Sequence, residues 1–338
     1  MQCLIWGAGA IGGTLGAVLA HNGHEVSLVD NVVEHVDAIN AHGLHITGPI
    51  ATFTQLLPAC TPDAVEGEWD VIILATKAHH TEAAAQALAP HLSASGYVVS
   101  AQNGLNEIVI SSIVGAPRTM GCFVNFGADY LEPGVIHYGG RAANVLGEID
   151  GRITPRLKAL HQAWLDFEER AVITDNIFGF LWGKEAYGAM LFATALTNES
   201  IADALAMPQY RPLYIALARE ILAVAAAQGV KPEGFDGFSP IAYLPSASAG
   251  AAEQSLDGLV AHNRTSAKTH SGIWRDLAVR KRRTEVDAQL GIVVTLGAQS
   301  GVPTPVLSRL VALIHDIEQG ARDQSLATLD VLLHAVPH

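Results

Sequence analysis

The sequence predicts an α/β fold with a parallel sheet in the first half of the chain, followed by an all-helical second half. Three observations predict it: a length of 338 residues, an alternation of strand-like and helix-like runs in the first half, and a near absence of strand-like runs afterwards. At roughly 100–200 residues per domain, this length favours two domains. We place their boundary near Asp175, which gives domains of residues 1–175 and 176–338.

The first half alternates short β-branched runs with helical stretches, an order typical of a parallel sheet with helices on both faces. The clearest helices are expected at Ile11–His21 and Glu82–Ala89, and Pro90 would stop the second one. Gly139 and Gly140 favour a hairpin turn between the strands that flank them. The expected strands are Cys3–Trp6, Glu25–Val29, Val71–Ala75, Tyr97–Ser100, Thr119–Val124, Gly134–Tyr138, Ala143–Leu146 and Ala171–Thr174.

The second half repeats apolar residues at helical spacing and carries few strand signals. Val230–Gly250 is rich in proline and glycine, so we expect a long loop there. A final helix would open at Asp323 or Ser325 and end near His334. The other expected helices are Phe178–Ala195, Pro212–Gln228, Ala251–Leu259, Glu285–Gln299 and Pro305–Gln319.

Composition excludes several classes of protein. The chain is 49% hydrophobic and only 16% charged, which argues against disorder. Its net charge of −13 repels phosphate polymers, so we expect no nucleic-acid partner. The apolar stretches are interrupted before the roughly 18 residues that a membrane span needs, so we expect no membrane partner. Three scattered cysteines without a CxxC pair indicate a soluble protein of the reducing cytoplasm, and fifteen histidines without an HExxH motif indicate no metal site.

A glycine-rich turn directly follows the first expected strand. Gly7 permits a tight turn, Gly9 lacks the Cβ that would block a pyrophosphate, and Gly12 lets the next helix pack closely on the strand. Ala10 and Ile11 open that helix, whose N-terminal N–H groups favour a phosphate. A GxGxxG motif alone is weak, but its place between a strand and a helix predicts a Rossmann dinucleotide-binding domain rather than an ordinary glycine turn.

Asp30 ends the second expected strand, where dinucleotide sites place a carboxylate on the adenosine ribose. A carboxylate there repels the additional phosphate of NADP, and neither Arg nor Lys occurs between Asp30 and His45. The sequence therefore predicts NAD as the cofactor in preference to NADP. The alternative is that Asp30 merely caps the following helix.

Two further turns follow expected strands and point to the same edge of the sheet. Lys77 follows Val71–Ala75, and Asn103 follows Tyr97–Ser100. Lys77 can meet the phosphates or ribose of the cofactor, and Asn103 offers both a donor and an acceptor to the nicotinamide or substrate. Read singly, these residues are equally consistent with a surface lysine and a common Asn-Gly turn.

Taken together, six motifs resemble those of ketopantoate reductases. They are GAGAIG, LATKA at Leu74–Ala78, AQNG at Ala101–Gly104, PGVIHYG at Pro133–Gly139, LWGK at Leu181–Lys184 and RRTEVD at Arg282–Asp287. The resemblance implies a Rossmann domain, a helical domain and a cleft between them. It also implies that a nicotinamide cofactor delivers hydride to the ketone of a 2-oxo acid.

The resemblance assigns roles to four residues. Lys184 matches the family's catalytic lysine, and Lys77 matches a lysine on the cofactor. Glu285 matches a glutamate on the cofactor ribose, and Asn103 an asparagine beside the nicotinamide and substrate. An ammonium at Lys184 can stabilise negative charge on the carbonyl oxygen and donate a proton to it. From the residues alone, Lys184 is either functional or a lysine that extends from an apolar helix to water, and Glu285 is a solvated carboxylate.

The chain also departs from the family. Members that reduce ketopantoate place asparagines one and two helical turns after the lysine, where Gly188 and Phe192 stand here. Losing two polar partners would weaken ketopantoate binding and leave a wider, drier pocket. For the family's substrate-side serine, Ser271 is the first candidate and Ser266 the second. The alternative for Ser271 is a helix-start cap.

These observations predict an NAD-dependent oxidoreductase that transfers hydride at a carbonyl or carbinol carbon of a small, carboxylate-bearing substrate other than ketopantoate. Lys184 would be the general acid in reduction and the base in oxidation. The alternatives are a genuine ketopantoate reductase using NADPH and a non-catalytic dinucleotide-binding sensor. We further expect a homodimer formed through the helical domain, because the high apolar content leaves surface to cover.

Overall fold

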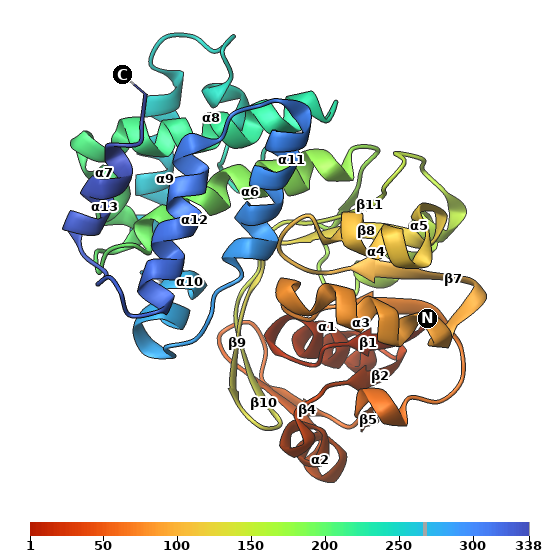
Figure 1. Ribbon diagram of the computed structural model, residues 1–338. Coiled ribbons are helices and arrows are strands. Elements are labelled where there is room, and N and C mark those ends of the chain that lie inside the picture. The colour runs from red at the N-terminus through yellow and green to blue at the C-terminus, as the bar shows by residue number, and fades with distance from the viewer. Residues whose placement is uncertain (266–268, 338) are drawn as a thin grey trace. The chain divides into compact units, whose positions relative to one another are not determined.

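The computed structural model describes residues 1–265 and 269–337, and its chain divides into two compact units, Met1–Ile177 and Phe178–His338 (Figure 1). The first unit is built on a largely parallel sheet and the second is helical. The predicted fold class, a Rossmann-type α/β domain followed by a helical domain, is confirmed.

The main sheet of the first unit has eight strands, of which β11 and β12 run opposite to the others. In spatial order they are β12 (Val172–Ile173), β11 (Asn144–Glu148), β8 (Thr119–Val124), β7 (Leu92–Ser100), β6 (Trp69–Leu74), β1 (Gln2–Trp6), β2 (Glu25–Val29) and β5 (Ala59–Cys60). Since β7, β6, β1 and β2 are neighbouring parallel strands, their carboxyl ends share one edge of the sheet.

Apolar layers cover both faces of this sheet. Along β1, Cys3 and Ile5 belong to one hydrophobic cluster and Leu4 and Trp6 to another, because successive strand residues point to opposite faces. The first cluster takes in the apolar sides of helices α1 (Ala10–His21) and α5 (Pro155–Trp164), and the second those of α3 (Thr81–Leu88) and α4 (Asn106–Val114). A further helix, α2 (Val33–His42), follows β2.

A second, smaller sheet corrects one prediction. The hairpin expected across Gly139 and Gly140 is wrong: Val135–Gly140 pairs instead with the preceding strand, across a turn at Pro133 and Gly134. The strand after Gly140 is buried along its whole length and lies antiparallel to β8 in the main sheet, since only an interior position covers both of its faces. In spatial order the small sheet contains β4 (Phe53–Gln55), β3 (Leu44–Thr47), β10 (Val135–Gly140) and β9 (Gly127–Glu132).

The described part of the second unit is helical. Its long Val230–Gly250 segment contains a single 3₁₀ turn, Pro240–Tyr243, and a bridge between Phe235 and Phe238. The helix expected to begin at Glu285 starts instead with a π-helical turn, Asp287–Gly291. Its helices are α6 (Ile177–Thr194, which begins at the last residue of the first unit), α7 (Ile201–Ala206), α8 (Arg211–Ala227), α9 (Ala251–Thr265), α10 (Gly272–Trp274), α11 (Ile292–Ser300), α12 (Pro305–Glu318) and α13 (Leu326–Leu333).

Among residues 1–265 and 269–337, no helix is both long enough and apolar enough to span a bilayer.

Candidate functional site

The backbone of the glycine loop after β1 leaves no room for side chains at two of its positions. Gly7 has a φ of +104°, and a Cβ on it would stand 2.8 Å from the backbone nitrogen of Thr76. A Cβ on Gly12 would stand only 2.0 Å from the carbonyl oxygen of Gly7. Close packing of loop, helix and neighbouring strand end therefore requires both glycines.

Gly9 differs from its neighbours because a Cβ there would meet no atom within 4 Å. It is the N-cap residue of α1, with Ala10 and Ile11 half-buried in the first turn behind it. The open space before Gly9 thus lies at the helix end that carries free N–H groups and the positive end of the helix dipole. These residues fit the pyrophosphate of a dinucleotide, which would take the space that a side chain would fill.

Asp30 contacts this loop directly. Its Oδ2 accepts a hydrogen bond of 2.9 Å from the Ala8 N–H, and its Oδ1 accepts one of 3.0 Å from the Val32 N–H. The N-cap of α2 is Val32 rather than Asp30, so the alternative of a simple helix cap does not describe this carboxylate. Each oxygen keeps a second lone pair for a ribose hydroxyl.

The surroundings of Asp30 are negative. Tyr130 of β9 has its pKa raised first by burial and then by the carboxylates of Asp30, Glu34 and Glu132. All three carboxylates therefore lie near the Tyr130 hydroxyl. A dianionic 2′-phosphate placed beside Asp30 would meet their combined charge.

A buried histidine that the sequence analysis did not single out also holds the loop. The Nε2 of His35 lies 2.9 Å from the Ala8 carbonyl oxygen, and its Nδ1 lies 2.9 Å from the Gly134 amide nitrogen. A carbonyl can only accept and an amide N–H can only donate, so the ring carries its proton on Nε2. Asp30 and His35 thus hold the N–H and the carbonyl of the same residue, Ala8. Sequence offered no signal for this, because His35 sits among surface-like residues of α2.

Lys77 and Asn103 are exposed at the same sheet edge. Lys77 follows β6 and precedes α3, while Asn103 follows β7 in a turn completed by Gly104, whose φ is +104°. The first unit therefore brings together four of the predicted cofactor groups: the glycine loop, Asp30, Lys77 and Asn103 each follow one of four neighbouring strands.

In the helical unit, Lys184 lies half-buried in the middle of α6. Next to it the backbone of the Val230–Gly250 segment rests on the helix: the Glu233 N–H donates to the Gly179 carbonyl at 2.9 Å. A Cβ on Gly183 would stand 2.2 Å from the Glu233 carbonyl oxygen. The glycine preceding Lys184 is therefore required by close backbone packing. Sequence analysis missed this role, although the spacing of Gly179 and Gly183 by one turn was visible.

The substrate candidates occupy different environments. Gly188, one turn after Lys184, is half-buried, and a Cβ on it would meet no atom within 4 Å. Phe192, two turns after Lys184, has 0% exposure and belongs to the packed interior. Ser271 is buried and its hydroxyl accepts from the Trp274 N–H at 3.1 Å, which is the helix-cap alternative. Ser266 lies outside the described residues.

Glu285 lies half-buried between two π-helical turns, Arg275–Val279 and Asp287–Gly291. Its neighbour Thr284 is held firmly, because one carboxyl oxygen of Glu318 accepts from the Thr284 N–H at 2.7 Å and from its hydroxyl at 2.8 Å. Single π-helical turns are rare and occur often at functional sites. Their place on both sides of Glu285 therefore favours a function for this stretch.

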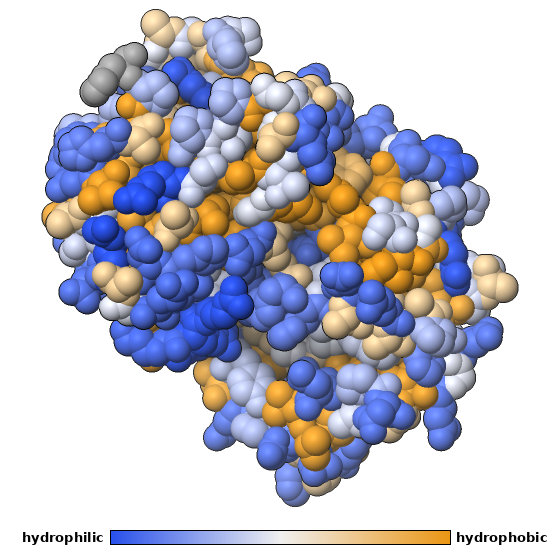
Figure 2. Space-filling model, viewed as in Figure 1, coloured by the Kyte–Doolittle hydropathy of each residue, from blue (hydrophilic) through white to orange (hydrophobic). Residues whose placement is uncertain are grey.

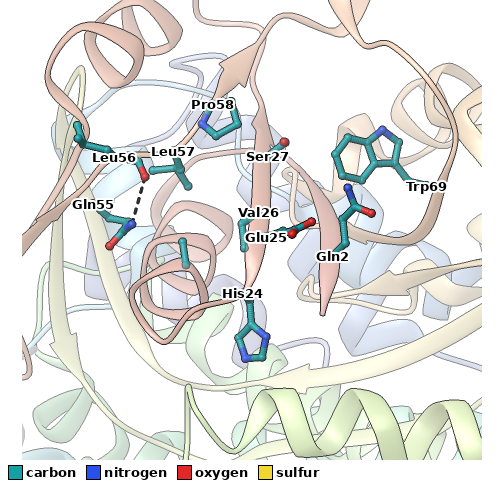
Figure 3. Close-up of a pocket in the computed structure, with 11 residues that line it drawn as sticks. Gln2, His24, Glu25, Val26, Ser27, Gln55, Leu56, Leu57, Pro58 and Trp69 are labelled. Atoms are coloured by element: carbon teal, nitrogen blue, oxygen red, sulfur yellow. Dashed lines mark hydrogen bonds between the residues drawn. The ribbon is translucent and has the colours of Figure 1, made fainter.

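A pocket of about 370 Å³ lies elsewhere, at the amino ends of β1 and β2 (Figure 3). Gln2, His24 and Glu25 line it together with Leu57 and Trp69. Ligands of open α/β sheets bind beyond the carboxyl ends of the strands, so this pocket is at the wrong edge for the cofactor. Among the described residues there is no cluster of three or more His, Cys, Asp or Glu able to hold a metal ion.

Comparison with known families matches both units. Residues 3–151 match the family model described as ketopantoate reductase PanE/ApbA, and residues 180–318 match its C-terminal model, which together account for most of the chain. The chain belongs to the ketopantoate reductase family. This confirms the resemblance inferred from the motifs.

Full-length relatives in this family carry the name 2-dehydropantoate 2-reductase. The Pyrococcus horikoshii protein is 28% identical over 320 residues, covering 93% of this chain and 96% of its own length. The Archaeoglobus fulgidus protein is 26% identical over 318 residues, covering 94% and 97%. The chain is therefore an oxidoreductase of the class that acts on CH–OH groups, with a nicotinamide cofactor and a 2-oxo acid type of reaction.

Solved structures of ketopantoate reductase type share the fold. A PanE/ApbA family ketopantoate reductase from Ralstonia eutropha aligns with a TM-score of 0.80 at 27% identity, covering 95% of this chain and 99% of that chain. D-mandelate dehydrogenase in its ternary structure with NADH and anilino(oxo)acetate aligns with a TM-score of 0.82 at 23% identity, covering 95% and 99%. The second likeness shows the fold alone.

Proposed function

We propose that this family member is an NAD-dependent oxidoreductase of 2-oxo and 2-hydroxy acids whose substrate carries a larger, less polar group than ketopantoate. The observation that carries this is Gly188, one turn after Lys184, where a side chain would enter open space. Ketopantoate-reducing members place an asparagine there. The hydrogen side chain of glycine removes a polar partner for the substrate hydroxyl and leaves room beside it. A substrate with an apolar substituent is therefore favoured over one with a hydroxyl.

Lys184 supplies the acid–base chemistry. Bound at the glycine loop and Asp30, the nicotinamide cofactor supplies or accepts the hydride at the substrate carbon. Lys184 Nζ, on the half-buried middle turn of α6, donates a proton to the carbonyl oxygen as negative charge develops there, and takes it back from the hydroxyl in oxidation. Asn103 orients the carbonyl end, and Glu285 accepts from a ribose hydroxyl of the cofactor.

The negative surroundings of Asp30 favour NAD over NADP. A ribose hydroxyl donates to the carboxylate, whereas a 2′-phosphate is repelled by Asp30, Glu34 and Glu132. The D-mandelate dehydrogenase structures, which share this fold, are complexes with NADH, and this supports the proposal. Because NAD is largely oxidised in cells, use of NAD favours oxidation of the hydroxy acid over reduction of the 2-oxo acid.

The decisive experiment is a turnover screen of 2-oxo acids, 2-hydroxy acids and aryl alcohols with NAD and NADP in parallel. We expect a bulky 2-oxo acid with NADH to give a kcat/KM above that of ketopantoate with NADPH. Lys184→Ala should lower kcat by about 100-fold or more while NADH still binds, as general acid–base groups contribute ~10²–10⁴-fold. Substantial turnover by Lys184→Ala with intact NADH binding would refute the role of the lysine.

Two other outcomes distinguish the alternatives. The names of the full-length relatives favour genuine ketopantoate reduction, which would appear as a preference for ketopantoate and NADPH. Binding of NADH without turnover of any acid would indicate a non-catalytic sensor.

We also propose that the protein forms a homodimer through its helical unit. Figure 2 shows hydrophobic side chains on the face that carries α11 and α12. Within these two helices, Ile292, Leu296 and Val311 are only half-buried. Sedimentation velocity should give a dimer, and Leu296→Glu should give a folded monomer. A wild-type monomer at micromolar concentration would refute this assembly. The expected cytoplasmic location rests on the cysteine pattern and stays a prediction.

A further inference from the structure

The turns that present Lys77 and Asn103 follow neighbouring strands, β6 and β7, and each leads into its own helix, α3 or α4. The strands pair only as far as Leu74 and Ser100, so beyond them other contacts must set the distance between the turns. Lys77 and Asn103 are exposed, but the residues beside Asn103 in its turn are buried, so buried side-chain contacts can set the relative position of the two turns.

Three buried side chains make those contacts. The Gln102 amide nitrogen donates to the Thr76 carbonyl at 2.9 Å and to the Thr81 hydroxyl at 2.9 Å. The Thr81 hydroxyl donates to the Asn106 side-chain oxygen at 2.8 Å, and the Asn106 amide nitrogen donates to the Asn103 carbonyl at 2.6 Å. The chain of bonds thus runs from the residue before Lys77 to the backbone of Asn103.

The direction of every proton in this chain is determined. Both of its ends are backbone carbonyls, which only accept, so the amide nitrogens of Gln102 and Asn106 must face them. The Asn106 oxygen then faces Thr81, and the Thr81 hydroxyl must donate to it while accepting from Gln102. Inverting either amide would bring two acceptors together at a carbonyl.

Burial gives this arrangement its importance. The exposed fractions are 2% for Thr81, 4% for Gln102 and 3% for Asn106, so water has little access to replace a missing partner. Thr81 stands at the centre, as the first residue of α3, and its hydroxyl is the link between Gln102 and Asn106. Removing that hydroxyl breaks the links to Gln102 and Asn106, while the direct bond from Gln102 to the Thr76 carbonyl remains.

We propose that Thr81 is a positioning residue of the reaction: through Asn106 it holds the Asn103 turn in register with the turn that presents Lys77. The inference rests on the proposed function of Asn103 at the nicotinamide and substrate. Thr81 touches neither ligand and acts on turnover through the geometry of Asn103.

The test compares Thr81→Val, which keeps the shape of the side chain, with Thr81→Ser, which keeps the hydroxyl. Thr81→Val should lower kcat by about 10-fold or more per NADH-binding site, and Thr81→Ser should restore most of it. Thr119→Val is the matched control, because Thr119 is also buried but donates locally to the Gly115 carbonyl at 3.1 Å. It should lower the melting temperature and leave kcat unchanged.

A double-mutant cycle separates this proposal from the function on which it rests. In an Asn103→Ala background, Thr81→Val should have no further effect on kcat, because the group that it positions is gone. If Asn103→Ala leaves kcat unchanged, the proposed role of Asn103 fails. If Asn103→Ala lowers kcat but Thr81→Val does not, or if the two effects simply multiply, the positioning role is overturned.

Should Thr81→Val fail to fold, Asn106→Leu removes the same link from the other side with little change in shape, because Asn106 is the residue that joins Thr81 to the Asn103 carbonyl. It should reproduce the loss of kcat and its absence in the Asn103→Ala background. An unchanged kcat in folded Asn106→Leu would overturn the proposal.

Discussion

Glu107 is a carboxyl buried deep in the first unit. It lies in the first turn of α4, and neither of its oxygens makes a hydrogen bond of ordinary geometry with any residue in the described ranges. Burial raises the pKa of Glu107 from 4.5 to about 8, and the nearby backbone N–H and the Ser100 hydroxyl offset only part of the rise. Gly121 borders it, since a Cβ there would stand 3.5 Å from a Glu107 oxygen, an ordinary contact distance. The residue is therefore held as a neutral acid near pH 7.

Glu107→Gln should change how stability depends on pH. The folded-state pKa is raised, so the folded protein keeps a proton that the unfolded chain releases above pH 4.5. The stability from this group is complete below pH 4.5 and is lost as the pH rises to about 8. We would compare urea unfolding at about pH 5.5 and about pH 8.5, on either side of neutral pH. Between these two values, the free energy of unfolding of the wild type should fall relative to that of Glu107→Gln. Glu68→Gln, at an exposed carboxyl, is the control; parallel profiles for wild type and Glu107→Gln would contradict the assignment.

Asp30→Asn should weaken the preference for NAD. The substitution keeps one acceptor oxygen but removes the negative charge that repels a 2′-phosphate, and it leaves the Ala8 and Val32 N–H groups with one acceptor between them. We expect the ratio of kcat/KM for NAD to that for NADP to fall by about 10-fold, which corresponds to ~1.4 kcal/mol. An unchanged ratio would mean that Asp30 does not select the cofactor.

At the scale of elements, α6 carries two glycines with opposite structural demands. A Cβ on Gly183 collides with the Glu233 carbonyl oxygen at 2.2 Å, whereas one on Gly188 meets nothing within 4 Å. The helix thus combines a backbone contact that needs a glycine with an opening that does not. Lys184 lies between these two glycines in the sequence of α6.

Alanine at these two positions should act in opposite directions. Gly183→Ala forces the Val230–Gly250 segment away from α6, and we expect a loss of about 1–3 kcal/mol in the free energy of unfolding together with a lower kcat. Gly188→Ala should gain roughly 0.5–1 kcal/mol, because alanine favours the helix, while raising KM for the bulkiest substrates. Thermal unfolding and initial rates measure both. Equal destabilisation by the two variants would contradict the packing, and an unchanged KM in Gly188→Ala would remove Gly188 from the substrate pocket.

At the scale of the whole molecule, the predicted cofactor loop, Asp30, Lys77 and Asn103 all belong to the first unit. Cofactor binding should therefore stabilise that unit, by about 2.7 kcal/mol at a free NADH concentration ~100 times its dissociation constant. NADPH at the same concentration should give a smaller rise in melting temperature. Calorimetric scans with each cofactor test this, and an equal rise with NADPH would contradict the preference for NAD.

Several elements were predictable because short-range physics determines them. The strands of the first half are runs of β-branched residues, and the GAGAIG turn between a strand and a helix leaves little choice of conformation. The missed α5 had a local signal, since Thr154 caps it and Pro155 opens it. In contrast, β9 has half-exposed residues without clear alternation, and its pairing with β10 depends on contacts that local sequence does not show.

The candidate site divides in the same way. Gly7, Gly12 and Asp30 carry a recognisable pattern because their contacts are to a backbone near in sequence or to a ligand of fixed geometry. The partners of His35 lie 27 and 99 residues away, and the hydrogen-bonded chain from Thr76 to Asn103 joins two loops by side chains alone. No spacing rule connects such residues, so only the folded backbone reveals them.

By itself, the sequence determined the α/β and helical halves, the glycine loop, the acidic residue at the end of β2 and membership of a reductase family. These features follow from side-chain periodicity and from turns that few residues tolerate. Only the tertiary structure decided which strand pairs with which, which glycine faces open space, and which buried groups hold the functional turns. Those outcomes depend on contacts between distant segments, where burial strengthens each hydrogen bond and makes each missing one costly.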